Sequence, residues 1–167
     1  MNSYRHQIRI RKEYLKFSAA HLTVFPDGTF ERLHGHNYTT EVTLGLKAIE
    51  FERLVPFSEI KKAIEELCEA WDERVLIPTQ NPYLKLGEQN GAQIEFWLGV
   101  KHYVLPKEDV VLLALDNITS ETLAAECCRR LISALQNKPG YDLIESVEFR
   151  VEESPGQGAC CIWKPQS

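Results

Sequence analysis

HGHNYTTEVTLGL, the segment at residues 34–46, has the clearest period in this sequence. Alternate side chains of an extended strand point to the same face, and every second position from the first histidine onward falls into one such set. That set is His34, His36, Tyr38, Thr40, Val42, Leu44 and Leu46. Because sustained alternation is typical of a half-buried strand, the segment predicts one long strand that begins with two histidines.

The residues before this segment predict a partner strand for it. Apolar side chains recur among charged neighbours over roughly the first 17 residues, at Ile8, Ile10, Leu15 and Phe17. This pattern predicts a single first strand. A turn-rich loop follows, with PDGTF at residues 26–30, so the two strands are expected to pair as a hairpin.

Two later segments have the spacing of amphipathic helices. The first follows Pro56, with Ser58 as its expected N-terminal cap, and the second begins near Thr119 or Ser120 and ends at NKPG, residues 137–140. Their apolar stripes are Ile60, Ala63, Ile64, Leu67 and Trp71 in the first helix and Leu123, Cys127, Leu131 and Leu135 in the second.

The remaining apolar runs predict strands at residues 93–104, 109–115, 144–152 and 159–163. No linker or internal repeat divides the chain, so residues 1–167 are expected to form a single domain. The order of hairpin, helix, strands, helix and hairpin predicts an α+β fold, with an antiparallel sheet and two helices packed on one face.

The composition excludes several classes of protein. Of 167 residues, 44% are hydrophobic and 26% charged, as in ordinary globular domains. No run approaches the ~18 apolar residues of a membrane span, and the first residues, MNSYRHQIRIRKEY, are too polar for a secretory signal. A net charge of −5 and five cysteines without CxxC spacing disfavour nucleic-acid binding and a disulfide framework. We therefore expect a cytoplasmic protein with neither membrane nor nucleic acid as a partner.

Three histidines form the strongest candidate site. His34 and His36 are two residues apart in a strand, so both can reach one metal ion, and Gly35 lies between them. His21 ends the segment FSAAH on the neighbouring arm of the expected hairpin. Three histidines leave the fourth position of zinc open, which is the arrangement of catalytic zinc sites. The sequence thus favours a bound Zn²⁺ ion.

A cupin metal motif is the rival interpretation of the same region. Its spacing is matched by Gly28, His34, His36 and Glu41. Glu41, however, is out of phase with the two histidines on an unbroken strand. The later cupin motif has no match, and two long helices fit poorly in a small jelly roll, so we disfavour a cupin.

With these motifs together, the sequence resembles the 6-pyruvoyl-tetrahydropterin synthase and 6-carboxytetrahydropterin synthase family. The resemblance runs from about residue 14 to residue 163 and is carried by FSAAH, LHGHNY, Trp71-Asp72, NITSE and VEESP, in that order. It implies a T-fold, in which subunits assemble into barrels with active sites at subunit interfaces. A homo-oligomer, commonly a hexamer built from trimers, is therefore implied as well.

The resemblance also implies roles for individual residues. The three histidines match the family's zinc ligands: His21, His34 and His36. Glu153 takes the position of the glutamate that anchors the guanidine-like edge of the pterin, an edge suited to two parallel hydrogen bonds. Thr119, Ser120 and Glu121 match the stretch that lines the pterin pocket. Family substrates are 7,8-dihydroneopterin triphosphate or its close relatives.

Two positions depart from the family pattern. Most members have a catalytic cysteine where this chain has Phe30, but the next residue, Glu31, gives ExxHGH. That motif resembles a variant branch with glutamate in place of cysteine, which forms 6-hydroxymethyl-7,8-dihydropterin. In place of the family's Asp-His pair after the first helix, this chain has Asp72-Glu73. Glu73 either acts as an acid or base where the family has histidine, or it is simply a solvated carboxylate.

The expected function is therefore a zinc-dependent lyase acting on a dihydropterin, with Glu31 as general base and Asp72 and Glu73 as further catalytic candidates. Two alternatives stay open: a divergent 6-carboxytetrahydropterin or 6-pyruvoyltetrahydropterin synthase, and a pterin- or purine-binding protein without catalysis.

Overall fold

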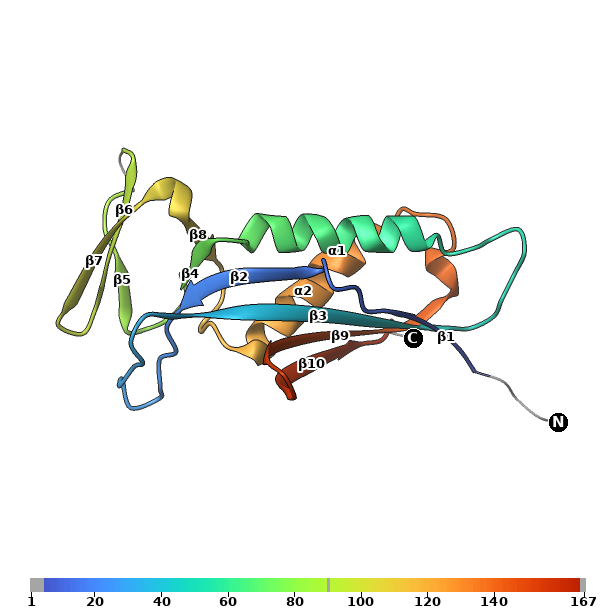
Figure 1. Cartoon of the computed structure of the whole chain (residues 1–167), viewed down its shortest axis with the longest axis horizontal. Coiled ribbons are helices and arrows are strands. Elements are labelled where there is room, and N and C mark those ends of the chain that lie inside the picture. Colours follow the sequence, from blue (N-terminus) through green and yellow to red (C-terminus); the bar gives the residue numbers. More distant parts are fainter. Residues whose placement is uncertain (1–4, 90, 166–167) are drawn as a thin grey trace.

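The computed structural model describes residues 5–89 and 91–165. It is an α+β fold with a curled seven-stranded sheet, two helices on one face of that sheet, and a separate three-stranded sheet at one end (Figure 1). The helices are α1 (Phe57–Trp71) and α2 (Ser120–Leu135). The strands are β1 (His6–Ile10), β2 (Lys16–His21), β3 (His34–Leu46), β4 (Arg74–Pro78), β5 (Leu84–Leu86), β6 (Gln93–Leu98), β7 (Lys101–Pro106), β8 (Val110–Leu113), β9 (Ile144–Ser154) and β10 (Gln157–Trp163).

Strand β3 is the long strand that the period of two predicts, with the expected bounds. Its first half pairs with β2 and its second half with β1, both antiparallel. The single first strand expected over the first 17 residues is therefore wrong, because the chain turns between β1 and β2. The N–H of Leu15 donates to the carbonyl of Lys12 at 3.0 Å in that turn, which buries the Leu15 side chain in the core.

The main sheet is mixed rather than wholly antiparallel. Its order is β10-β9-β3-β2-β4-β8, with β1 beside β3, and β4 pairs in parallel with both β2 and β8. The sequence analysis missed β4, a five-residue run directly after the first helix. Helix α1 carries the chain back from the end of β3 across one face of the sheet, so β4 runs opposite to β3 and in the direction of β2 (Figure 1).

The single strand expected over residues 93–104 is in fact a hairpin, β6 followed by β7. The turn contains Gly99 with φ of +57°, a left-handed conformation that glycine adopts without steric cost. Together with β5, this hairpin makes the three-stranded sheet, called here the lobe (residues 84–106).

The helices agree with the expected positions except at one cap. Helix α1 begins at Phe57 after Pro56 and has no side-chain cap, so Ser58 lies inside the first turn rather than capping it. Helix α2 has Thr119 as its N-cap, and a reciprocal capping box joins Thr119 and Thr122. The start predicted for this helix is confirmed.

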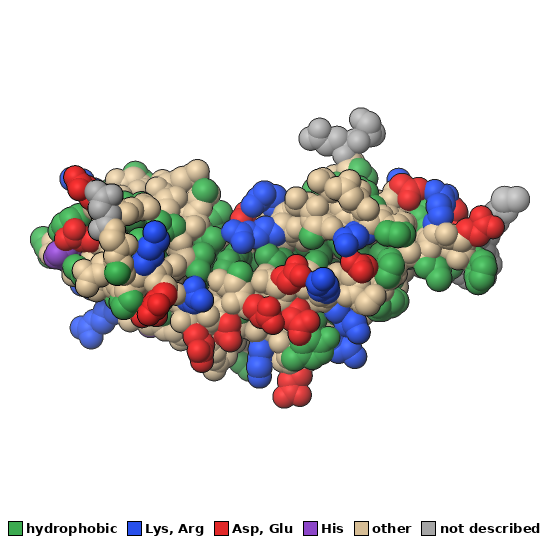
Figure 2. Space-filling view, turned by 90° about the horizontal axis from the view of Figure 1, so that it is seen from above, with side chains coloured by type: hydrophobic (Ala, Val, Ile, Leu, Met, Phe, Trp, Pro, Cys, Tyr) green, Lys and Arg blue, Asp and Glu red, His purple; other side chains and the backbone are tan. Residues whose placement is uncertain are grey.

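Two hydrophobic clusters hold these layers together. The larger lies between the main sheet and the helices and includes Phe17, Tyr38 and Trp71. The smaller joins the lobe to the end of the main sheet. Among the described residues, no helix is long and apolar enough to span a membrane. Acidic and basic side chains are interspersed on the face seen from above the helices (Figure 2).

Candidate metal centre and adjoining cavity

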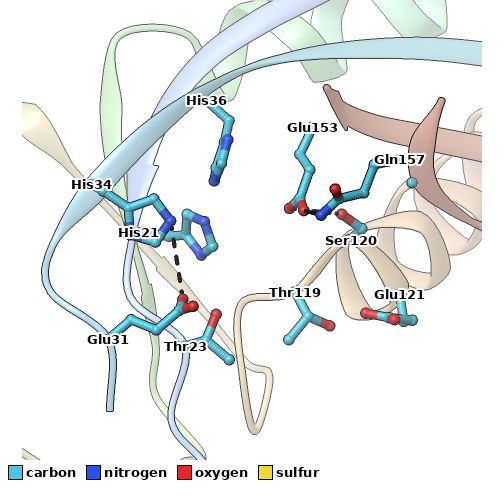
Figure 3. Close-up of a pocket in the computed structure, with 11 residues that line it drawn as sticks. His21, Thr23, Glu31, His34, His36, Thr119, Ser120, Glu121, Glu153 and Gln157 are labelled. Carbon is cyan, nitrogen blue, oxygen red and sulfur yellow. Dashed lines mark hydrogen bonds and ion pairs between the residues drawn. The ribbon is translucent and has the colours of Figure 1, made fainter. Parts of the chain in front are cut away.

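A cavity of about 370 Å³ opens where the ends of β2 and β3 face the start of α2 and the β9–β10 turn (Figure 3). Three separate stretches of the chain contribute to it. Its lining residues are His21, Thr23, Glu31, His34, His36, Thr119, Ser120, Glu121, Glu153, Gln157 and Gly158. Most of the residues expected in the site are therefore brought to one place.

The three histidines meet at one wall of this cavity. His21 is paired with His34 in the β2–β3 register, and His36 follows two residues later on the same face. One ring nitrogen from each histidine lies within 4.8 Å of the corresponding nitrogens of the other two. The hairpin thus assembles the triad that the spacing predicts.

Backbone carbonyls orient two of the rings. Nδ1 of His21 lies 2.9 Å from the carbonyl oxygen of Ile118, and Nδ1 of His34 lies 2.8 Å from that of Arg32. Since a carbonyl oxygen only accepts, each Nδ1 carries a hydrogen, and in the neutral ring Nε2 is then the nitrogen with the lone pair. Such second contacts fix the tautomer of a metal-binding histidine.

The buried ring of His21 has the donor chemistry of a metal ligand. Its side chain is buried, yet Nε2 has no hydrogen-bond partner among the described residues. A buried polar atom without a partner is costly. Burial lowers the pKa of His21 below its ordinary value, and the two neighbouring histidines act in the same direction. A neutral imidazole with a free lone pair fits a zinc ligand, and the triad as a whole fits the three-histidine donor set of catalytic zinc.

Glu31 lies beside the triad on the loop between β2 and β3. Its Oε2 atom lies 4.0 Å from Nε2 of His34. The backbone N–H of Glu31 donates to the carbonyl of Thr23 at 2.9 Å, which fixes the chain at this point. The carboxylate is partly exposed and projects into the cavity (Figure 3), within reach of a ligand bound at the histidines.

Glu153 lies across the cavity from Glu31 (Figure 3). The hydroxyl of Ser120 donates to its Oε2 at 3.1 Å, and the side-chain amide of Gln157 donates to its Oε1 at 2.5 Å. Both carboxylate oxygens are therefore held in place before any ligand binds. A carboxylate fixed in this way can accept two parallel hydrogen bonds from a planar donor edge.

The start of α2 forms the floor between these two walls. Thr119 caps the helix, and its hydroxyl is the main cause of a lowered pKa at Glu121. Ser120 is buried and Glu121 lines the cavity. The cavity lining of one subunit includes three glutamates and no lysine or arginine, so these walls favour cations and hydrogen-bond donors.

Asp72 and Glu73 lie elsewhere in this chain. Oδ1 of Asp72 accepts the backbone N–H of Ser18 at 2.6 Å, and the N–H of Glu73 donates to the carbonyl of Ser18 at 2.7 Å. Glu73 has φ of +55° and lines a second hollow, which it shares with Asn37 and with His36 of the triad. Within one subunit, neither carboxylate joins the lining of the histidine cavity.

The sequence analysis missed four contributors to the site. Thr23, Gln157 and Gly158 line the cavity, and the carbonyl of Ile118 orients His21. The pairing of Ser154 with Gln157 across the β9–β10 turn could have indicated that Gln157 lies near Glu153. The contact between Ile118 and His21 has no local signal in the sequence.

Comparisons with known proteins agree with this geometry. Residues 9–162 match the family described as 6-pyruvoyl tetrahydropterin synthase. A protein of Methanocaldococcus jannaschii, provisionally named 6-carboxy-5,6,7,8-tetrahydropterin synthase, is 34% identical over 147 residues, which are 87% of this chain and 88% of that protein.

Solved structures share the fold. The 6-pyruvoyl tetrahydropterin synthase of Plasmodium vivax superposes with a TM-score of 0.88 and 23% identity, over 98% of this chain and 100% of that chain. The enzyme of Plasmodium falciparum has a TM-score of 0.86 and 22% identity over the same shares. A P. vivax variant with one glutamate changed to alanine is described as a catalytic residue mutant.

Proposed function

This chain belongs to the 6-pyruvoyl tetrahydropterin synthase family, and from that premise we propose that the histidine cavity is the active site of a zinc-dependent lyase acting on a dihydropterin. The coarse class, a pterin synthase-type lyase, follows from the family. Zinc, the substrate and the roles of single residues are the proposal. The observation that carries it is the juxtaposition in one cavity of three histidines, Glu31 and a carboxylate held by two donors, Glu153.

Glu153 is proposed to bind the pterin ring. The pyrimidine part of a pterin presents adjacent N–H donors, and the two held oxygens of Glu153 are placed to accept from them. This would direct the substituent at the other end of the ring toward the histidines. The proposed substrate is 7,8-dihydroneopterin triphosphate or a close relative with a hydroxylated side chain.

His21, His34 and His36 would hold the zinc ion. When bound there, zinc supplies Lewis acidity toward the oxygens of the substrate side chain. The hydrogen bonds from His21 to Ile118 and from His34 to Arg32 keep the ring nitrogens directed at the shared point.

Glu31 is proposed as the general base. It removes the proton from a side-chain hydroxyl, whose oxygen then forms a carbonyl while the bond between the first and second side-chain carbons breaks. The electron pair passes into the conjugated C=N bond of the dihydropterin, and a proton returns to the first carbon. The products are 6-hydroxymethyl-7,8-dihydropterin and an aldehyde. The catalytic glutamate described for the P. vivax protein supports a carboxylate in this role.

A divergent 6-carboxytetrahydropterin synthase is the second candidate. It is favoured by the M. jannaschii relative, whose provisional name carries that activity. A pterin-binding protein without catalysis is the third candidate, because the histidine and glutamate walls could bind a ligand without turning it over.

Asp72 and Glu73 are proposed to act across a subunit boundary, in a homo-oligomer such as a hexamer of two trimers. Neither lines the histidine cavity of its own chain, so their proposed role in proton transfer is at the cavity of a second copy. Complementation tests this. If Glu31→Ala and Glu73→Gln are each inactive, mixed and reassembled subunits should regain turnover, and failure to regain it argues against a shared site.

Product identification tests the function as a whole. Zinc-loaded protein is incubated with 7,8-dihydroneopterin triphosphate and the pterin product is identified by mass spectrometry. A 6-hydroxymethyl product supports the first candidate, a carboxy or pyruvoyl product the second, and binding without turnover the third. Glu31→Ala should abolish product while zinc content and pterin affinity persist, whereas Glu52→Ala, at an exposed glutamate, should match the wild type.

A further inference from the structure

The loop that carries Glu31 is attached to the lobe through the preceding residue. This loop leaves the main sheet after His21 and returns at His34, at the same end of the molecule as β5–β7 (Figure 1). Within it, Phe30 is partly buried and packs against the smaller hydrophobic cluster, which includes Leu98 of the lobe.

The tip of the β6–β7 hairpin contacts the Phe30 ring directly. A Cβ atom built on Gly99 would lie 3.2 Å from Cε1 of Phe30, so the absence of a side chain there lets the hairpin backbone approach the ring. Nζ of Lys101 lies 4.8 Å from the centroid of the same ring, a cation–π arrangement. Two residues of the lobe therefore hold one aromatic side chain.

Phe30 and Glu31 are linked through the backbone. Phe30 forms a β-bridge with Val24, and the N–H of Glu31 donates to the carbonyl of Thr23 at 2.9 Å. Neighbouring residues in extended backbone direct their side chains to opposite sides. Phe30 accordingly packs on the lobe, and Glu31 lines the cavity. The packing of the Phe30 ring therefore fixes the direction of the Glu31 side chain.

We propose that Phe30 is a positioning residue that fixes the Glu31 carboxylate toward the substrate, and that Gly99 and Lys101 of the lobe form its seat. The inference rests on the proposed role of Glu31 as general base. Proton transfer requires the base within hydrogen-bond reach of its target, and a displacement of about 1 Å can cost about 10²-fold in rate. Phe30 is not among the described residues that line the histidine cavity, so it acts through its neighbour.

The test separates kcat from KM. Phe30→Ala should lower kcat by roughly 10- to 100-fold, with KM, zinc content and pterin affinity close to the wild type. Phe30→Leu, which keeps an apolar side chain in the seat, should recover most of the loss. Val100→Ala is the matched control, because Val100 lies in the same turn with its side chain fully exposed, at 101%, and it should leave kcat unchanged.

The outcomes distinguish this inference from the proposed function. If Glu31→Ala retains turnover, the role of Glu31 fails and the positioning of Glu31 by Phe30 fails with it. If Glu31→Ala is inactive but Phe30→Ala turns over at the wild-type rate, only the positioning role is overturned. Loss of zinc or of pterin affinity in Phe30→Ala would also overturn it, since the residue would then be holding the whole site together.

Discussion

Nδ1 of His21 donates to the carbonyl oxygen of Ile118 at 2.9 Å, although 97 positions separate the two residues in the chain. Ile118 directly precedes Thr119, the N-cap of α2. The start of this helix therefore does two things at once: it orients one imidazole of the triad and supplies the hydroxyl that holds Glu153. Predictions about the metal, the ligand and stability follow from this arrangement.

Replacing His34 or His36 by alanine should remove the metal without unfolding the protein. Both side chains are only partly buried, so the core is little affected, whereas two remaining imidazoles bind zinc far more weakly than three. Elemental analysis of the purified variants checks this, with circular dichroism as a control for folding. His102→Ala, whose ring pairs with Glu95 on the lobe, should keep its zinc; retention of stoichiometric zinc in both triad variants would contradict the prediction.

Asn117→Ala should destabilise the fold. The side-chain amide of Asn117 accepts a hydrogen bond from the N–H of Val24 at 3.1 Å and donates one to the carbonyl of Val24 at 2.8 Å. Val24 is buried, and these two bonds satisfy its backbone groups as a neighbouring strand would. Leaving these groups without partners costs about 1–3 kcal/mol. Urea unfolding should show a loss of that size, and Asn137→Ala, at an exposed position, should show almost none.

Glu153→Gln should weaken pterin binding while leaving zinc content unchanged. The glutamine amide carries no charge and presents an N–H donor to the donor edge of the pterin ring. A hydrogen bond to a charged group contributes about 1.5–3 kcal/mol, so its loss should lower the affinity roughly 10- to 100-fold. Fluorescence titration with a dihydropterin measures this effect. Gln157→Ala, which removes one donor to the carboxylate, should have a smaller effect, and equal affinity in all three proteins would count against Glu153 as the anchor.

Glu126 should stabilise the protein in a pH-dependent way. Hydrogen bonds from Arg129, and then from Arg130, lower the pKa of Glu126, and they outweigh the opposite effect of partial burial. Because the folded pKa lies below the unfolded value, the stabilisation is complete above about pH 4.3 and is lost as the pH falls through the folded pKa. Arg130 also lies over the Trp71 ring, 5.4 Å from its centroid. Because Arg130 belongs to α2 and Trp71 to α1, this contact joins the two helices.

Glu126→Gln should accordingly lower the free energy of unfolding by roughly 0.5–1 kcal/mol at pH 7, the size expected for two helix ion pairs. The difference from wild type should shrink as the pH falls through the folded pKa of Glu126 and should disappear at a low pH where the carboxyl group is protonated in both states. Urea unfolding at both pH values measures it, with Glu65→Gln on the exposed side of α1 as the control. A difference that persists at low pH would show that charge is not its cause.

Local patterns predicted the parts of the fold that depend on near neighbours. The period of two predicted the bounds of β3, and the cap at Thr119 predicted the start of α2. Both signals are contained within a dozen or so residues of chain, as is the pairing of His34 with His36. One strand pairing, between β2 and β3, then places His21 beside these two histidines.

Features set by distant parts of the chain were not predicted. β4 is parallel to β2 because β3 and α1 lie between them in the chain and together return it to the direction of β2, and nothing within the five residues of β4 indicates direction. The turn at Gly99 lies inside a strand-like run of residues, and its left-handed backbone is fixed by the pairing of β6 with β7 on its two sides. Asp72 and Glu73 lie away from the cavity because of the position at which α1 ends in the fold. No local sequence motif indicates that position.

The division of the cavity between two hairpins has a consequence for evolution. The three histidines belong to β2 and β3, whereas Glu153, at the end of β9, and Gln157 and Gly158, at the start of β10, flank the β9–β10 turn at the opposite wall. Substitutions or insertions in that turn can change which molecule is recognised while the histidines keep their geometry. A lineage with this architecture can therefore acquire a new substrate by drift in one short surface turn, without passing through an ancestor that has lost the histidine triad.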